Sequence, residues 1–471
     1  MSNQSDAVSG ESKNKPKFQF PHVFIILFGI IIIVSILSYI IPSGEFDREE
    51  VDGTTTVVEG TYHAVQADLP GIFDIFLAIP SGMLEGGSII FFILIVGGSF
   101  GIVLSTNAVE AFIAKMTNVM GNKEIYLIPV LMLFFALGGA TFGMAEEIIP
   151  FMLISVPLAI RIGYDSLVGA AIVIVGAYSG FTAAFINPFT VGVAQTIAEL
   201  PLFSGMFVRI VFWFVFVGIS IAYVMFYAIK IKKNPQKSIM YKEDKDRDHE
   251  PSKEQEVMFT VRHGLIIATL VLTLVGLALG VIFLDWYVNE IAALFVIMGV
   301  IAGIIAKMSP NQIAESFIKG CETLVVGALV VGLAYGILVI LEDSKTIDTI
   351  LNFASTLVGN LPGYLSAMGM YITQSALNFI VPSGSGQAAL TMPIMTPLSD
   401  LVGVSRQTAV LAFQMGDGIS NIVTPTSGAF MAALAIARVS WIKWMKWVWP
   451  LILIHYLLGA IFVTVAHVFI W

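Results

Sequence analysis

Two adjacent glutamates, Glu146 and Glu147, interrupt an otherwise apolar stretch of the chain, residues 124–160. They follow a run of mostly small residues, 138–145, that contains no Lys or Arg. A carboxylate in such surroundings costs several kcal/mol unless a cation or a proton compensates its charge. The pair therefore predicts a site for a cationic ligand, a metal cation or a proton. Because neighbouring helical residues point about 100° apart, we expect one glutamate to face the ligand and the other to be free for a structural role.

Three more interruptions carry polar residues: the tip Pro-Ser-Gly-Ser-Gly-Gln at 382–387, and breaks at Asn187-Pro188 and Thr424-Pro425. Proline removes a helical hydrogen bond, and the freed backbone groups need protein, water or ligand as partners. The predicted substrate-binding residues are Glu146, Glu147, Asn187, Thr190, Asn378, Ser383, Ser385, Gln387, Asp417, Asn421, Thr424, Thr426 and Ser427. The predicted gating residues are Gly384, Gly386, Pro188 and Pro425. A coupling sodium near Asn187 and Thr424, or a coupling proton, completes the hypothesis, and no other cofactor is expected.

Each feature also has a simpler interpretation. Small residues at 382–387 allow close helix packing. Asn187 and Thr424 can satisfy the backbone that their prolines free, and Asp417 can act as a cap. Asp165, at an expected hairpin–helix turn, is expected to be solvated.

The composition predicts a protein with many membrane-spanning segments. Of 471 residues, 57% are hydrophobic and 12% are charged, whereas soluble domains have about 25% charged residues. The net charge of -9 leaves no basic surface for nucleic acid. The single cysteine, Cys321, excludes disulfides within the chain and cysteine-based metal cages. No phosphate-binding loop, His/Asp metal spacing or nucleophile elbow is present, so we do not expect an enzyme or an ATP-driven pump.

Charged residues at the ends of the apolar runs set the predicted orientation. The loop 44–67 is acidic and carries one basic residue, Arg48, whereas 230–262 is rich in lysine. Positive residues mark the cytoplasmic side, so we expect the N-terminus inside and the C-terminus outside. Nine spans of roughly 20 residues follow, two of them interrupted. They are 22–41, 83–106, 167–200, 206–229, 263–284, 290–307, 320–341, 408–437 and 449–470. Amphipathic surface segments are expected at 109–120 and 347–357.

Two stretches do not fit as simple spans. Residues 124–160 begin and end on the inner side, and 362–401 begin and end on the outer side, so each reads as a re-entrant hairpin. With the matched breaks at Pro188 and Pro425 they form an inverted repeat. Inverted repeats with broken helices are typical of transporters whose site lies at the membrane midplane.

The runs Gly-Met-Ala-Glu-Glu at 143–147 and Gly-Asp-Gly-Ile-Ser-Asn-Ile-Val-Thr-Pro-Thr-Ser-Gly at 416–428 resemble the YfcC-type branch of the anaerobic dicarboxylate-carrier family, in the ion transporter superfamily. The resemblance covers nearly the whole chain. It implies an elevator-type transporter of the bacterial plasma membrane, usually a homodimer, with scaffold and transport domains. The transport domain would comprise 122–200 and 360–437. The remaining parts would be the tail and scaffold helices 1–121, scaffold helix 201–230, cytoplasmic linker 231–262, scaffold helices 263–359, and the last segment 438–471.

The substrate follows less directly. Members of that family are described as dicarboxylate carriers, basic amino acid carriers or arginine/ornithine exchangers. Acidic residues without a basic partner in the tips and breaks favour a cationic amino acid, and arginine/ornithine exchange is the specific hypothesis. A sodium- or proton-coupled dicarboxylate carrier and an ion channel remain as alternatives.

Overall fold

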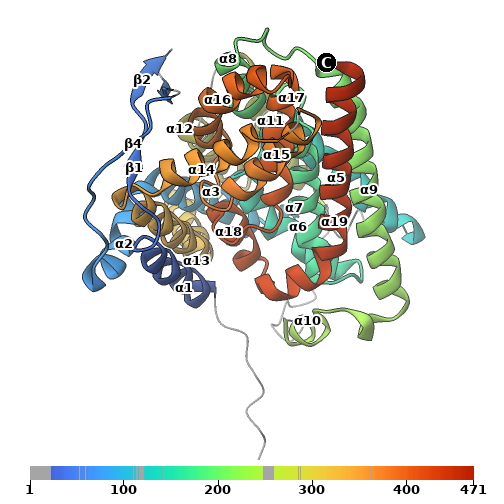
Figure 1. Cartoon of the computed structure of the whole chain (residues 1–471). Coiled ribbons are helices and arrows are strands. Elements are labelled where there is room, and N and C mark those ends of the chain that lie inside the picture. The colour runs from blue at the N-terminus through green and yellow to red at the C-terminus, as the bar shows by residue number, and fades with distance from the viewer. Residues whose placement is uncertain are drawn as a thin grey trace, which may run out of the picture.

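The computed structural model describes residues 23–51, 54–58, 60–109, 111–112, 115, 121–141, 143–247, 259–284, 286, 288–361 and 363–471. The N-terminal tail and most of the predicted surface segment 109–120 lie outside these residues. The described chain is mostly helical, with a small β-structure at one edge (Figure 1).

The helices before residue 248 are α1 (Val23–Leu37), α2 (Ile72–Glu85), α3 (Gly87–Ser105), α5 (Leu127–Thr141), α6 (Ile148–Arg161), α7 (Ser166–Thr182), α8 (Val193–Ile197), α9 (Met206–Lys233) and α10 (Tyr241–Arg247). The later helices are α11 (Val261–Leu284), α12 (Val288–Ile305), α13 (Pro310–Asp343), α14 (Ile347–Gly359), α15 (Gly363–Leu377), α16 (Gly384–Leu401), α17 (Arg406–Ser420), α18 (Gly428–Ile436) and α19 (Trp441–Val465). Short 3₁₀ or π segments are η1 (Gly121–Tyr126), η2 (Pro188–Gly192), η3 (Pro235–Lys237) and η4 (Ala466–Ile470).

Six of the described helical segments are long and apolar enough to cross a membrane: Gly87–Ser105, Lys123–Thr141, Met206–Lys233, Val288–Ile305, Pro310–Asp343 and Trp441–Ile470. The chain is therefore a multi-pass membrane protein, as its composition predicts.

Local sequence signals explain where several of these helices begin. Ser309 caps α13: its hydroxyl accepts from the Gln312 backbone N–H, the Gln312 side chain returns to the Ser309 N–H, and Pro310 occupies the first turn. This reciprocal capping satisfies donors that have no helical partner. Ser383, Ser405 and Ser427 cap α16, α17 and α18 with the same type of bond.

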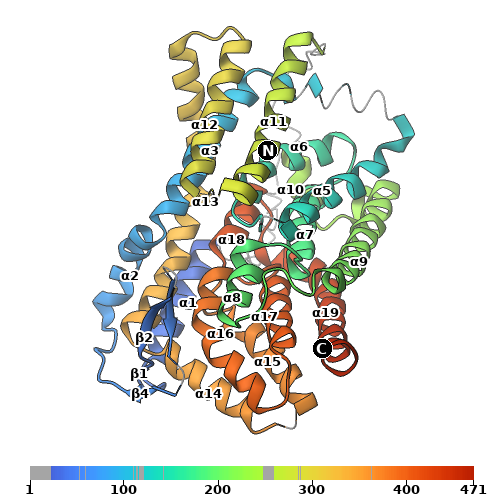
Figure 2. The same ribbon diagram turned by 90° about the horizontal axis from the view of Figure 1, so that it is seen from above.

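The helices form two groups that lie side by side (Figure 2). The α13 group comprises α1, α2, α3, α11, α12 and α13. Its centre is a glycine seam, in which Gly101 of α3 lies directly against Gly320 of α13. The α7 group comprises α5, α6, α7, α9, α15, α16, α17 and α19, with α5 packed on α7 and α15 packed on α17. Helix α18 joins the groups, because it packs against α13 and also against α6.

Strands occupy the loop between α1 and α2, where we expected only an acidic loop. Strand β1 (Gly44–Glu45) pairs antiparallel with β4 (His63–Ala64), and β2 (Arg48–Val51) pairs antiparallel with β3 (Thr54–Val57). The loop is fixed to the turn after α13, since the Gly44 N–H donates to the Lys345 carbonyl at 2.9 Å. A hydrogen bond from Lys345, at 2.7 Å, holds the pKa of Glu45 below its ordinary value. On its other side, β3 lies against α16.

Several predicted boundaries are wrong. The span predicted at 83–106 is preceded by helix α2, which starts at Ile72 and meets α3 at Gly86. The span predicted at 320–341 is a helix of 34 residues that begins at Pro310. The last helix begins at Trp441 instead of 449, so its Trp- and Lys-rich start is helical. Hydropathy marks apolar windows, whereas helices continue until a cap or a break ends them.

Asp165 is a further correction, because it is buried instead of solvated. It caps α7, and its carboxylate accepts hydrogen bonds from Tyr227 and Ser238, each at 2.7 Å. The first part of the predicted linker 231–262 is therefore packed. Within it, Asp244 accepts from the Ser166 backbone N–H at 2.7 Å.

Candidate functional site

The first tip lies between α5 and α6, and the structure describes its residues 143–147. Gly143 has a φ of +68°, a left-handed conformation that glycine adopts without strain, and an added Cβ would lie 2.8 Å from the Asn187 side-chain oxygen. That oxygen accepts from the Phe189 backbone N–H at 2.9 Å. The tip and the first helix break are therefore packed directly on each other.

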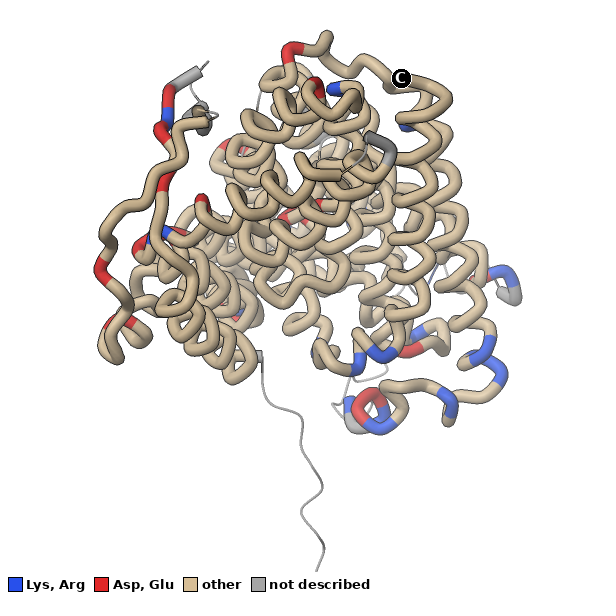
Figure 3. The backbone as a smooth tube through the Cα atoms, viewed as in Figure 1, with Lys and Arg blue, Asp and Glu red and all other residues tan. Residues whose placement is uncertain are grey.

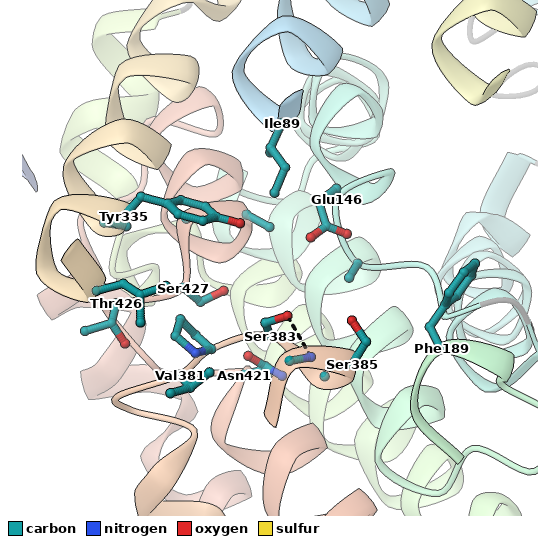
Figure 4. Close-up of a pocket in the computed structure, with 18 of the residues that line it drawn as sticks. Ile89, Glu146, Phe189, Tyr335, Val381, Ser383, Ser385, Asn421, Thr426 and Ser427 are labelled. Atoms are coloured by element: carbon teal, nitrogen blue, oxygen red, sulfur yellow. Dashed lines mark hydrogen bonds between the residues drawn. The ribbon is translucent and has the colours of Figure 1, made fainter. Parts of the chain in front are cut away.

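The second tip lies between α15 and α16. Ser383 begins α16 and accepts from the Gly386 N–H at 3.3 Å, a bond drawn in Figure 4. A Cβ on Gly384 would lie 2.5 Å from the Thr190 methyl group and 3.2 Å from Asp417 Oδ2. Glycine is required here because the second tip reaches both helix breaks at this point.

The second break, between α17 and α18, is held by its own polar residues. Thr424 donates to the Ser420 carbonyl at 2.7 Å, and Asn421 donates to Asp417 Oδ1 at 2.9 Å. Thr426 donates to the Phe379 carbonyl at the end of α15, at 2.7 Å. Part of the polar content of the break thus satisfies backbone that the interruption frees.

Both tips and both breaks line one cavity of about 370 Å³, within the size range of small-molecule sites. The opposite wall belongs mainly to α13, with Val331, Ala334, Tyr335 and Leu338. In Figure 4 the Glu146 carboxylate and the Tyr335 hydroxyl both point into this space. The cavity therefore lies where the α7 group meets the α13 group.

The cavity includes most of the predicted binding residues but not all of them. Those that line it are Glu146, Glu147, Thr190, Ser383, Ser385, Asn421, Thr426 and Ser427, together with the predicted gating glycines Gly384 and Gly386. Those that do not are Asn187, Asn378, Gln387, Asp417 and Thr424, with the predicted gating residue Pro425. The side chain of Pro188 lies outside the described part of the structure.

The five predicted binding residues outside the cavity are buried, and two of them join helices to one another. Gln387 donates to the Gln374 side chain and backbone, at 2.7 and 2.9 Å, and so joins α16 to α15. Asn378 donates to Ser420 Oγ at 2.7 Å and to the Asp417 carbonyl at 3.2 Å.

The two tip glutamates differ in their surroundings. Glu147 Oε2 accepts from the Ala145 backbone N–H at 3.1 Å, which ties it to the tip. Among the described residues, no side chain bonds to the Glu146 carboxylate and no cation pairs with either glutamate. The cavity thus presents negative charge that its own tips and breaks do not compensate.

A basic residue that the sequence did not single out as part of the site, Arg48, also lines the cavity. Its Nη2 lies 2.9 and 3.0 Å from the two carboxylate oxygens of Asp348, at the start of α14, so its charge is already paired. Glu342, near the end of α13, and Tyr335 were missed as well. The available signal for Arg48 was its isolation as the one basic residue of an acidic loop.

Asp417 is the residue best placed to hold a bound cation. It is fully buried, and its Oδ2 has no hydrogen-bond partner among the described residues. Thr190 Oγ1 is likewise buried and without a hydrogen-bond partner among the described residues, and the Thr190 methyl lies beside Gly384, as Asp417 Oδ2 does. Oxygen atoms of this kind are the ligands that hard cations prefer. The described residues contain no cluster of three or more His, Cys, Asp and Glu side chains suited to a metal.

The chain matches known proteins over nearly its whole length. Residues 20–468 match the DcuC family, described as C4-dicarboxylate anaerobic carrier. The chain is 37% identical over 470 residues to the "Putative basic amino acid antiporter YfcC" of Escherichia coli (strain K12), covering 92% of this chain and 93% of that protein. It is 29% identical over 502 residues to an uncharacterized protein of Haemophilus influenzae, covering 96% and 98%.

Two solved transporter structures are similar at low identity. The YdaH transporter of Alcanivorax borkumensis aligns with 15% identity and a TM-score of 0.45, covering 96% of this chain and 99% of that one. MtrF of Neisseria gonorrhoeae aligns with 16% identity and a TM-score of 0.40, covering 96% of each chain. The family match spans nearly the whole chain, so this protein belongs to the DcuC family and is a membrane transporter.

Proposed function

We propose that this protein is a secondary transporter of basic amino acids, and specifically an arginine/ornithine exchanger. One observation carries the proposal: Glu146 and Glu147 face a ligand-sized cavity to which the tips and breaks contribute no cation. The one arginine in the lining is bound to Asp348. A cationic side chain would supply the missing charge, whereas a dianion would add to the repulsion. The name of the Escherichia coli relative points to the same substrate class.

Counterflow into vesicles tests this substrate. Purified protein is reconstituted with internal ornithine, and uptake of labelled arginine is followed with succinate as the competing alternative. We expect saturable arginine uptake that requires internal ornithine and that succinate does not inhibit. Succinate counterflow without arginine counterflow would refute the proposal.

A second candidate is a sodium- or proton-coupled dicarboxylate carrier, which the description of the family favours. The start of α16, with Ser383 and Ser385 in the lining, is a position where a helix attracts carboxylates. Asp417 Oδ2 and Thr190 Oγ1 would then hold the coupling cation. This candidate requires succinate uptake that depends on a sodium or proton gradient, which the same vesicles can measure.

For the mechanism, we propose an elevator movement of two re-entrant hairpins and two broken helices, arranged as an inverted repeat. The paired packing of α5 on α7 and of α15 on α17 supports the repeat. The cavity lies between these helices and the α13 group, so a displacement of one group would expose the site on alternate sides. Figure 3 shows Lys and Arg gathered around α10 and the adjoining ends of α9 and α19, which supports a cytoplasmic position for that end.

A crosslink between the groups tests the movement. A Cβ built on Gly327 of α13 lies 3.4 Å from the Cβ of Ala432 of α18, close to the separation found in disulfides. In a Cys321→Ser background, Gly327→Cys with Ala432→Cys should abolish exchange when oxidised and recover it on reduction. Each single cysteine variant serves as the control. Full exchange by the crosslinked protein would exclude a sliding movement at this contact.

A further inference from the structure

The cavity has a second charged end, away from the tip glutamates. Helix α13 lines it with Val331, Tyr335, Leu338 and Glu342, which recur at three- and four-residue spacing on one face. Glu342 lies just before the end of the helix, where Arg48 and Ile347 also reach the cavity. At a rise of 1.5 Å per residue, Glu342 lies about 10 Å along the axis from Tyr335. Glu146 and this second end are thus parts of one elongated site.

Arg48 is held in a fixed position but retains hydrogen-bonding capacity. Its Nη2 binds both Asp348 oxygens, at 2.9 and 3.0 Å, and its Nη1 donates to the Phe46 carbonyl at 3.3 Å. Asp348 is itself buried and also accepts from the Phe46 backbone N–H at 3.0 Å. A guanidinium has five N–H donors, and the hydrogen bonds within the described residues use one Nη1 and two Nη2 hydrogens. The Nε hydrogen and the other Nη1 hydrogen are therefore available to a ligand. These donors suit a carboxylate.

Glu342 supplies the complementary charge at the same end. It is exposed to the cavity, and none of the recorded hydrogen bonds or ion pairs of the described structure involves its carboxylate. An acceptor of this kind suits an ammonium group. Arg48 and Glu342 together match the α-carboxylate and α-ammonium groups of an amino acid. Glu146 supplies a second negative charge at the other end of the cavity.

We infer that Arg48 and Glu342 form a head-group station, which binds the α-carboxylate and α-ammonium of the substrate while its cationic side chain reaches Glu146. This inference rests on the proposed function and names which part of the substrate lies at which end. An extended arginine measures roughly 7 Å between its carboxylate and guanidinium carbons, because six bonds of about 1.5 Å lie in a zigzag. Hydrogen bonds of about 3 Å at both ends extend this reach to roughly 13 Å, which exceeds the roughly 10 Å between Tyr335 and Glu342 along α13.

Analogues that lack one head group test the assignment in reconstituted full-length protein. Arginine counterflow is competed with agmatine, which lacks the carboxylate, and with Nα-acetylarginine, which lacks the ammonium. In the wild-type protein both should compete roughly 10- to 100-fold less well than arginine, as expected when charged hydrogen bonds are lost. Arg48→Gln should abolish the discrimination against agmatine, and Glu342→Gln should abolish that against Nα-acetylarginine.

A matched control separates the head-group contact from the integrity of the loop. Glu45→Gln breaks the neighbouring ion pair with Lys345 but alters no residue of the cavity lining, so it should keep the wild-type preference. An equal change of preference in Glu45→Gln and Arg48→Gln would overturn the role of the guanidinium. If the Arg48→Gln protein does not insert into the membrane, the Glu342→Gln protein tests the head-group station. That substitution removes no hydrogen bond or ion pair among the described residues.

The outcomes also separate this inference from the proposed function. Arginine exchange with equal competition by arginine and both analogues overturns the head-group station and leaves the exchanger intact. Absence of arginine exchange in the wild-type protein overturns both.

Discussion

Replacing Glu146 by glutamine keeps the size of the side chain and removes its negative charge from the cavity. Among the described residues no other side chain bonds to the Glu146 carboxylate, so the substitution should change ligand binding far more than folding. A hydrogen bond to a charged group stabilises by about 1.5–3 kcal/mol. This range corresponds to a rise of roughly 10- to 150-fold in the arginine concentration that half-saturates exchange.

Glu147→Gln should behave differently, because Glu147 accepts from the Ala145 N–H at 3.1 Å. An amide oxygen can keep that bond, so we expect a smaller loss of affinity than in Glu146→Gln. Glu147→Ala, which removes the acceptor, should lower the unfolding temperature of the purified protein as well.

The assay is arginine counterflow over a concentration series, with thermal unfolding followed on the same preparations. Glu124→Gln is the matched control, since Glu124 is paired with Lys232 at 2.7 Å and does not line the cavity. Wild-type half-saturation in Glu146→Gln, or a larger loss in Glu147→Gln than in Glu146→Gln, would refute the assigned roles.

Three further predictions concern packing. Gly384→Ala should slow exchange, because its methyl group would lie 2.5 Å from the Thr190 methyl; adding Thr190→Ser, which removes that methyl, should restore turnover, and no rescue would contradict the steric cause. Gly143→Ala should destabilise the protein by about 1 kcal/mol or more, since its φ of +68° is strained for alanine; an unchanged unfolding temperature would count against this. Asp244→Asn weakens the bond to the Ser166 N–H, and a loss of about 1 kcal/mol should appear as a lower unfolding temperature, with exchange retained at low temperature.

The interruptions could be predicted from sequence because proline and glycine act on the backbone locally. Regular helix ends near each predicted interruption: α5 ends at Thr141, α7 at Thr182, α15 at Leu377 and α17 at Ser420. However, α16 begins at Gly384, inside the predicted tip 382–387. Their convergence on one cavity followed from the expectation that such interruptions meet near the membrane midplane, and eight of the thirteen predicted binding residues line that cavity.

The direction of each side chain could not be predicted in the same way. Gln387 and Ser385 are two residues apart at the start of α16, yet Ser385 faces the cavity and Gln387 faces Gln374. Which face of a short helix is buried depends on its neighbours, and these come from distant parts of the chain. Arg48 is the extreme case, because its partner Asp348 lies 300 residues away.

The prediction that Asp165 is exposed to solvent was wrong for a related reason. Its position at a turn predicted exposure to solvent, but the loop after α9 packs against it, and Ser238 of that loop donates a hydrogen bond to its carboxylate. A loop rich in charge looks like a linker in sequence, whereas Met240 within it is buried and anchors it to the helices.

The division of the cavity between two helix groups has a consequence for transport. The wall that α13 contributes is apolar at Val331, Ala334 and Leu338. A substrate that slides along this wall has no polar contacts with it to break. During the movement the substrate is held by charged groups of the tips, which move together with it in the proposed mechanism. Glu342 belongs to the opposite group, so it can bind the substrate only before the movement. Its loss should therefore raise the substrate concentration that half-saturates exchange on one side of the membrane alone, which right-side-out and inverted vesicles can distinguish.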